Sequence, residues 1–141
     1  TPQRLLRDIG ESLRRSIAGS SGPLYAAALL RASHILTGIE RPTDAQWLDA
    51  FEGAIAALQD IGGARPGDRT MLDALVPASL AWRQNGWLAG ASAAETAAAA
   101  TASMRPRMGR AAYLGDRAMG QPDGGAVAVA IWLKAIEEAL A

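Results

Sequence analysis

The sequence predicts an all-α fold, an up-and-down antiparallel bundle or barrel of about six helices. Alanine, which has the highest helix propensity, is very abundant, whereas β-branched residues are sparse. Apolar residues recur three or four positions apart in several segments, which is the spacing of an amphipathic helix. Short connectors containing glycine, proline or serine separate these segments, so consecutive helices are expected to lie antiparallel.

The first half of the chain predicts three helices. Thr1 and Pro2 have the residue types of an N-cap and a first helical position, and an apolar face follows them. A second helix is expected over residues 23–36, after a connector rich in glycine and serine. The third starts after residues 41–44 and ends at Gly62, where two successive glycines are typical of a C-cap.

The second half predicts three more helices. Asp68 is the expected N-cap of a helix that ends at Gly86. The segment Ser92-Ala93-Ala94-Glu95 has the form of a capping box and predicts an alanine-rich helix after it. The last helix is expected to begin near Gly125 and to reach Leu140.

The longest connector, residues 108–126, is the most unusual part of the sequence. Long loops of this kind in compact domains are usually functional or disordered. Five glycines allow tight turns or a close approach of the backbone to a ligand, and Tyr113 and Leu114 offer apolar surface that argues against disorder. Arg110 and Arg117 are interpreted either as anion ligands or as salt-bridge partners of the nearby aspartates.

Composition argues against several classes of function. The 141 residues fit one domain, and the balance of 14 basic and 14 acidic residues favours neither a nucleic-acid nor a membrane partner. There is no cysteine, no apolar run of the roughly 18 residues that span a bilayer and no signal-peptide pattern, so we expect a cytoplasmic protein. One histidine, His34, and no close carboxylate cluster leave no metal ligand set and no nucleophile with a base. We therefore expect no catalytic side chain and no metal ligand in this sequence.

Three connectors favour anion binding instead. Residues 19–22, 66–70 and 120–125 each lead into an expected helix N-terminus, where unpaired N–H groups and the positive end of the helix dipole are exposed. Glycine lets a ligand approach the backbone, and serine or threonine hydroxyls add donors, a combination that suits phosphate. The alternative is ordinary helix capping by the same side chains. Methionines such as Met71 either line a pocket for a flat heteroaromatic ring or pack in the core.

Several motifs occur together in one order. They are Gly19-Ser20-Ser21-Gly22-Pro23-Leu24-Tyr25, Pro66-Gly67-Asp68-Arg69-Thr70-Met71 with Asp73, and Gly109-Arg110-Ala111-Ala112-Tyr113-Leu114-Gly115-Asp116-Arg117 followed by Pro122-Asp123-Gly124-Gly125-Ala126. In order and spacing, the chain resembles the DhaL family, the nucleotide-binding subunit or C-terminal domain of dihydroxyacetone kinases, over essentially all its residues. The resemblance implies a barrel of up-and-down amphipathic helices that holds an adenine nucleotide, ADP or ATP, at one end.

The resemblance also implies roles for individual residues: the two serines of the first motif would contact phosphate, and the loop at 123–124 would close over the nucleotide. Together with the connector analysis, it gives the expected nucleotide-binding residues: Ser20, Ser21, Gly62, Thr70, Met71, Arg110, Asp123 and Gly124.

The sequence departs from the family in two places. The family's Gly-Asp-x-Asp-His-Gly-x-Asn motif, whose carboxylates hold magnesium, is absent, and the family's Asp-Pro-Gly is replaced by Asp-Gly-Gly at 123–125. We therefore expect residues 1–141 to be a single DhaL-like domain that is N-terminally incomplete, with the Mg²⁺ ligands in the missing segment. Such a chain alone should transfer phosphate poorly.

Two functions agree with these observations. The first is the nucleotide-binding component of a ketose kinase, which transfers a phosphoryl group to a small keto sugar such as dihydroxyacetone held by a partner domain or subunit. The phosphate would come either from exchangeable ATP or from a tightly held ADP recharged by a phosphocarrier protein. The second is a non-catalytic helical interaction module with the same fold.

Overall fold

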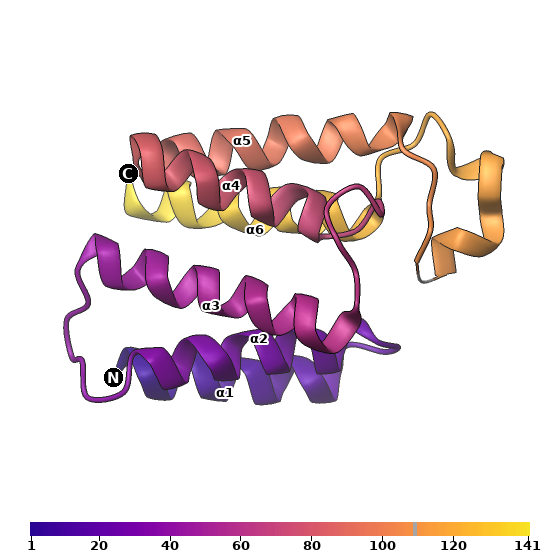
Figure 1. Cartoon of the computed structure of the whole chain (residues 1–141). Helices are drawn as coiled ribbons and strands as arrows, with labels where there is room; N and C mark the ends of the chain where they lie inside the picture. Colours follow the sequence, from indigo (N-terminus) through magenta and orange to yellow (C-terminus); the bar gives the residue numbers. More distant parts are fainter. Residues whose placement is uncertain (109) are drawn as a thin grey trace. The chain divides into compact units, whose positions relative to one another are not determined.

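The computed structural model describes residues 1–108 and 110–141, with only the backbone of Arg110. All regular secondary structure in these residues is helical, which confirms the predicted fold class (Figure 1). The chain divides into two compact units, residues 1–63 (unit 1) and residues 64–141 (unit 2). None of the described helices combines the length and the apolar character needed to cross a membrane.

Unit 1 consists of three helices: α1 (Pro2–Ser16), α2 (Ser21–Ile35) and α3 (Asp44–Gly62). The middle helix, α2, packs against both of the others. Ala32, Leu36 and Ala50 are buried together in a small core, and the partly buried Trp47 packs against them. Helices α2 and α3 start and end within about two residues of the expected positions, and α1 starts at the expected Pro2.

Three helix ends of unit 1 are capped within the expected segments: at Thr1, within residues 41–44 and at the glycine pair 62–63. The Thr1 hydroxyl accepts a hydrogen bond from the N–H of Arg4 at 3.2 Å. Thr43 and Gln46 cap each other reciprocally, because each side chain accepts a hydrogen bond from the other residue's N–H, at 3.3 and 2.9 Å. Gly63 ends α3 at φ 70°, a left-handed conformation that glycine adopts without steric cost.

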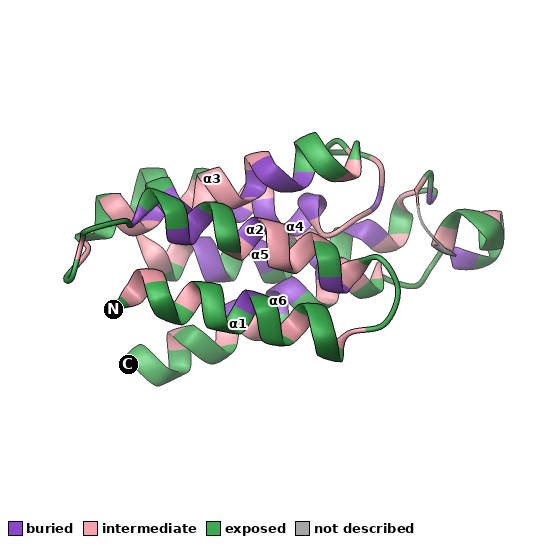
Figure 2. Ribbon diagram, turned by 90° about the horizontal axis from the view of Figure 1, so that it is seen from below, coloured by how far each residue is buried: buried purple, intermediate pink, exposed green. Residues whose placement is uncertain are grey.

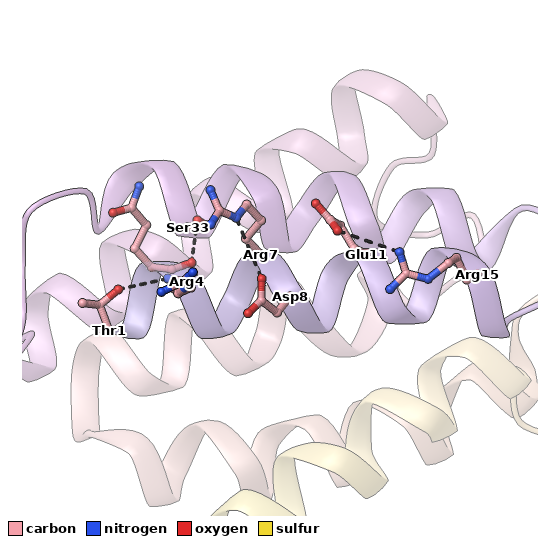
Figure 3. A network of polar contacts seen from close by, with 8 residues as sticks. Thr1, Arg4, Arg7, Asp8, Glu11, Arg15 and Ser33 are labelled. Carbon is pink, nitrogen blue, oxygen red and sulfur yellow. Dashed lines mark hydrogen bonds and ion pairs between the residues drawn. The ribbon is translucent and has the colours of Figure 1, made fainter.

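Exposed charged side chains of α1 form ion pairs along the helix (Figure 3). The side chains of Arg7 and Asp8 approach to 3.9 Å, and those of Glu11 and Arg15 approach to 3.8 Å. Exposed pairs of this kind add little to stability. The buried Ser33 hydroxyl of α2 donates a hydrogen bond to a first-turn carbonyl of α1 at 2.8 Å, which helps to fix the register of the two helices.

Unit 2 consists of three α-helices and two 3₁₀ segments: α4 (Leu72–Asn85), α5 (Trp87–Ala100), η1 (Thr101–Ser103), η2 (Arg110–Ala118) and α6 (Gly124–Leu140). Helix α5 packs against both α4 and α6, and α4 and α6 also contact each other. The helices carry buried residues interspersed with exposed ones, as Figure 2 shows.

Small residues bring α4 and α5 close together. A Cβ built on the buried Gly90 of α5 would lie 2.9 Å from the carbonyl oxygen of Ala78 in α4. At the turn between the two helices, Trp82 and Trp87 pack edge to face with ring centroids 4.7 Å apart. Three alanines of α5 are also buried: Ala91, Ala94 and Ala98. These small buried residues of α5 allow α4 and α5 to pack at a short interhelical distance.

Two predicted caps in unit 2 are wrong. Helix α5 begins directly after Gly86, so Ser92 and Glu95 lie inside it and do not form a capping box. The residues before Ser92 pack on α4, and this burial extends the helix beyond the local signal. Helix α4 begins only at Leu72, because Asp68 accepts a hydrogen bond within its own connector, from a backbone N–H at 2.9 Å.

We predict that Gly22→Ala destabilises unit 1. A Cβ at the buried Gly22 would lie 2.6 Å from the backbone oxygen of Ile17, and a backbone group cannot rotate away. The expected loss in free energy of unfolding is about 1–3 kcal/mol, measured by urea denaturation. Gly53→Ala is the matched control, since its Cβ would meet the movable end of the Ile35 side chain. An equal loss in both variants would contradict the close approach at Gly22.

Candidate functional site

The N-termini of α4 and α6 lie side by side in unit 2. Because α4 and α6 both run antiparallel to α5, they are parallel to each other and begin at the same end (Figure 1). A Cβ built on Gly125, in the first turn of α6, would lie 3.5 Å from both the Cβ and the backbone N of Met71. The positive ends of two helix dipoles therefore meet, and the region is electrostatically suited to an anion.

A tight hydrogen-bonded turn leads into α4. The buried carboxylate of Asp73 accepts hydrogen bonds from the N–H of Gly67 at 2.6 Å and from the N–H of Thr70 at 2.8 Å. The Thr70 hydroxyl in turn accepts from the N–H of Leu72 at 3.2 Å. Thr70, predicted as a nucleotide ligand, thus also helps to cap α4, and Met71 directly precedes the first residue of the helix.

Asp123 caps α6. Its carboxylate accepts a hydrogen bond from the N–H of Ala126 at 2.9 Å, as an N-cap residue does. Its own N–H donates to the hydroxyl of Thr101 at 2.8 Å. Thr101 is fully buried, and its hydroxyl also donates to the carbonyl of Ala98. The end of α5 is therefore hydrogen-bonded to the start of α6.

The first turn of α6 leaves backbone donors available. The N–H of Ala126 is bound to Asp123, and the N–H of Val127 donates to the Asp123 carbonyl at 2.9 Å. Within the described part of the chain, the N–H groups of Gly124 and Gly125 have no recorded acceptor, as is usual at a helix start. A Cβ built on Gly124 would meet nothing within 4 Å, so the backbone there is open to a ligand.

Arg69 is a residue of the site region that sequence reasoning did not single out. It is only 3% exposed, and it is the non-glycine residue with positive φ, 62°, in the described part of the chain. Its guanidinium donates to the carbonyls of Thr101 and Ala118, at 3.1 Å each, and to that of Gln121. An arginine in a short polar connector gives no sequence signal of burial, because charged side chains there are normally solvated.

The remaining predicted ligands lie in unit 1 or fall outside the description. Ser20 is exposed and makes no side-chain cap of α2, and Ser21 begins that helix and is half-buried. A Cβ on Gly62 would lie 3.4 Å from the Leu24 side chain, which places the end of α3 beside the first turn of α2. The side chain of Arg110 lies outside the described residues.

Among the described side chains of the long loop, that of Asp116 lies 3.8 Å from Arg105, and both are exposed. A salt bridge of Arg110 with Asp116 or Asp123, one of the two expected alternatives, lies outside the described residues. Among the described residues, no three histidine, aspartate or glutamate side chains gather as metal ligands.

Comparison with known proteins identifies the family. The model of the DAK2 domain matches residues 1–138. The chain belongs to the DAK2 domain family. It is 35% identical to a D-erythrulose kinase of Mycolicibacterium smegmatis, over 95% of this chain and 25% of the relative. It is 34% identical to the ADP-binding subunit DhaL of the PEP-dependent dihydroxyacetone kinase of Escherichia coli, over 89% of this chain and 64% of that subunit.

A solved structure supports the same family assignment. The dihydroxyacetone kinase of C. freundii in complex with AMP-PNP and Mg²⁺ superposes with a TM-score of 0.74 and 31% identity, over 98% of this chain and 23% of that protein. The resemblance to the DhaL family is therefore confirmed. The DAK2 chain spans about a quarter of the length of the erythrulose kinase relatives that it matches.

We predict that Thr101→Val destabilises the start of α6. Valine keeps the volume of threonine but leaves the N–H of Asp123 without its acceptor, which costs about 1–3 kcal/mol. Thr101→Ser retains the hydroxyl and should lose less. Thermal or urea denaturation measures the loss, and hydrogen exchange should accelerate at Asp123 in the valine variant alone. If serine and valine behave alike, the hydroxyl does not hold the α6 cap.

Proposed function

We propose that the chain binds an adenine nucleotide, ADP or ATP, with the phosphates at the paired N-termini of α4 and α6. One observation carries this proposal: the two helix starts approach so closely at Gly125 that a Cβ would lie 3.5 Å from the backbone N of Met71. Two positive helix ends and the free N–H groups of Gly124 and Gly125 suit a diphosphate. The ADP-binding role of the E. coli DhaL relative supports the same ligand.

The residues around this position have separate roles in the proposal. The backbone of Gly124 and Gly125 donates to phosphate, while the carboxylate of Asp123 holds the first turn of α6 in shape. Thr70 and Met71 form the α4 side, where the half-buried thioether of Met71 suits contact with a flat ring. Backbone donors that are already fixed lose little entropy when they bind a ligand.

We further propose that the intact protein is a ketose kinase of the dihydroxyacetone type. The γ-phosphoryl group of ATP would pass to a hydroxyl oxygen of a small keto sugar: the bond to the β-phosphate breaks, ADP is left and the hydroxyl proton is released. A partner domain or subunit would hold the sugar, as the fraction of the kinase relatives matched by this chain suggests. The proposal assigns the nucleotide to this part, and the Mg²⁺ ligands would come from the acidic motif that the family resemblance implies and that the given sequence does not contain.

Ser20, Ser21, Gly62 and Arg110 stay predictions from the resemblance. The assignment of Ser20 is supported by its exposed hydroxyl, which does not cap α2.

We predict that Arg110→Ala weakens nucleotide binding more than it lowers the melting temperature. A large loss of stability with unchanged binding would show that Arg110 forms a structural ion pair and does not bind the nucleotide.

We predict that the chain binds ADP more tightly than AMP, and AMP more tightly than adenosine. Each phosphate adds charge that the two helix ends can stabilise. Isothermal titration calorimetry with the three ligands, with and without Mg²⁺, measures this order. No heat with any nucleotide, from a sample shown to be folded by circular dichroism, would favour the alternative of a non-catalytic helical module.

We predict that Gly124→Ala weakens ADP binding about tenfold or more without loss of stability. The added methyl would meet no protein atom within 4 Å, so only a bound ligand can clash with it. Ala128→Ser adds one atom at an exposed position of the same helix and is the matched control. Unchanged ADP affinity in Gly124→Ala would exclude close contact between phosphate and this backbone.

A further inference from the structure

We propose that Arg69 is a positioning residue for the nucleotide, which it would not touch. It fixes the backbone that leads into the N-terminus of α6 and so keeps this terminus beside the start of α4. This inference rests on the proposed function, since it concerns the helix ends that would bind phosphate.

Arg69 connects three segments that are distant in sequence. It lies in the connector before α4, and its Nε donates to the carbonyl of Thr101, where α5 ends, at 3.1 Å. Its Nη2 donates to the carbonyl of Ala118, the last residue of η2, at 3.1 Å, and to the carbonyl of Gln121. Gln121 stands two residues before the α6 cap, Asp123. One side chain thus joins the entry of α4 to the entry of α6.

Further hydrogen bonds close the base of the long loop at the same place. The N–H of Gly120 donates to the carbonyl of Ala102 at 2.8 Å, and the N–H of Arg107 donates to the carbonyl of Asp68 at 3.4 Å. We call the backbone of residues 101–102 and 118–121 the loop base. Arg69 supplies its side-chain donors to the loop base, which ends two residues before Asp123.

The burial of Arg69 requires all these acceptors. A cation that is 3% exposed is tolerated only when its N–H groups are hydrogen-bonded. The Thr101 carbonyl lies at the C-terminal end of α5, so the negative end of that helix dipole adds favourable charge. The planar guanidinium can reach several carbonyls at once, whereas a lysine ammonium acts as a compact point charge. If the loop base moved, Arg69 would lose its partners.

The left-handed backbone of Arg69 supports the same role. A φ of 62° is unusual for arginine, yet the turn is held on both sides by the bonds of Asp73 to Gly67 and Thr70. Arg69 thus contributes its backbone to the turn that begins α4 and its side chain to the hydrogen bonds that hold the entry of α6. This coupling is what makes Arg69 a positioning residue and not merely a buried one.

The test compares Arg69→Met, Arg69→Lys and the control Arg65→Met in the full chain. Arg65 lies in the same connector, is exposed, and its replacement removes the same charge. ADP association and dissociation rates are measured by stopped flow with a fluorescent ADP analogue, well below the melting temperature of each variant. Hydrogen exchange of the Gly120 and Asp123 amides is followed without nucleotide.

We expect Arg69→Met to dissociate from the ADP analogue about tenfold faster or more, with little change in the association rate. The Gly120 and Asp123 amides should exchange faster, while the amides in the middle of α4 and α5 should not. Arg69→Lys should lie between wild type and Arg69→Met, and Arg65→Met should match wild type.

Two results would overturn the inference: wild-type dissociation in folded Arg69→Met, or unchanged exchange at Gly120 and Asp123. If Arg69→Met does not fold, Arg69→Lys decides by the same two measurements, because it keeps the charge and loses the planar fork. If wild type binds no ADP analogue, the proposed function fails together with the nucleotide role of Arg69. The exchange data then still decide whether Arg69 fixes the loop base.

Discussion

The parallel approach of α4 and α6 is the constraint on which the site in unit 2 depends. It arises because α5 runs antiparallel to both helices and packs against both of them. The buried residues of α5 are glycine and alanine, whose small size allows this close packing. Glycine at 125 then lets the first turn of α6 come against Met71. Like ends of two dipoles repel each other, so this arrangement is costly without a compensating charge, and the carboxylates of Asp73 and Asp123 supply part of it.

Most polar residues near the two helix starts have a structural role as well as an expected functional one. Asp123 caps α6, Thr70 and Asp73 hold the turn before α4, and Thr101 joins the end of α5 to Asp123. Phosphate and helix-capping interpretations of these connectors are therefore compatible. Side chains satisfy some of the exposed amides and fix the turn, and the amides left at Gly124 and Gly125 are the ones that a ligand can use.

Membership of the DAK2 domain family gives this geometry its chemical context. Phosphoryl transfer needs little covalent chemistry from a protein, because positioning and charge neutralisation supply most of the catalysis. The absence of a paired nucleophile and base in the sequence is therefore compatible with the proposed kinase role. In that proposal, this chain positions the nucleotide and a partner domain positions the sugar, so the precision of the helix ends matters more than any one reactive side chain.

The sequence by itself determined the helical class, the presence of six α-helices in the described residues and the cap at Thr1, because these depend on local spacing and propensity. It also indicated the family, through several motifs that occur in one order along the chain, and the family match confirms this. Only the tertiary structure decided that α5 runs through Ser92 and that Arg69 is buried against the carbonyls of three distant residues. The physical reason is the same in each case: the deciding partners are far apart in sequence, and burial against them outweighs the local signal.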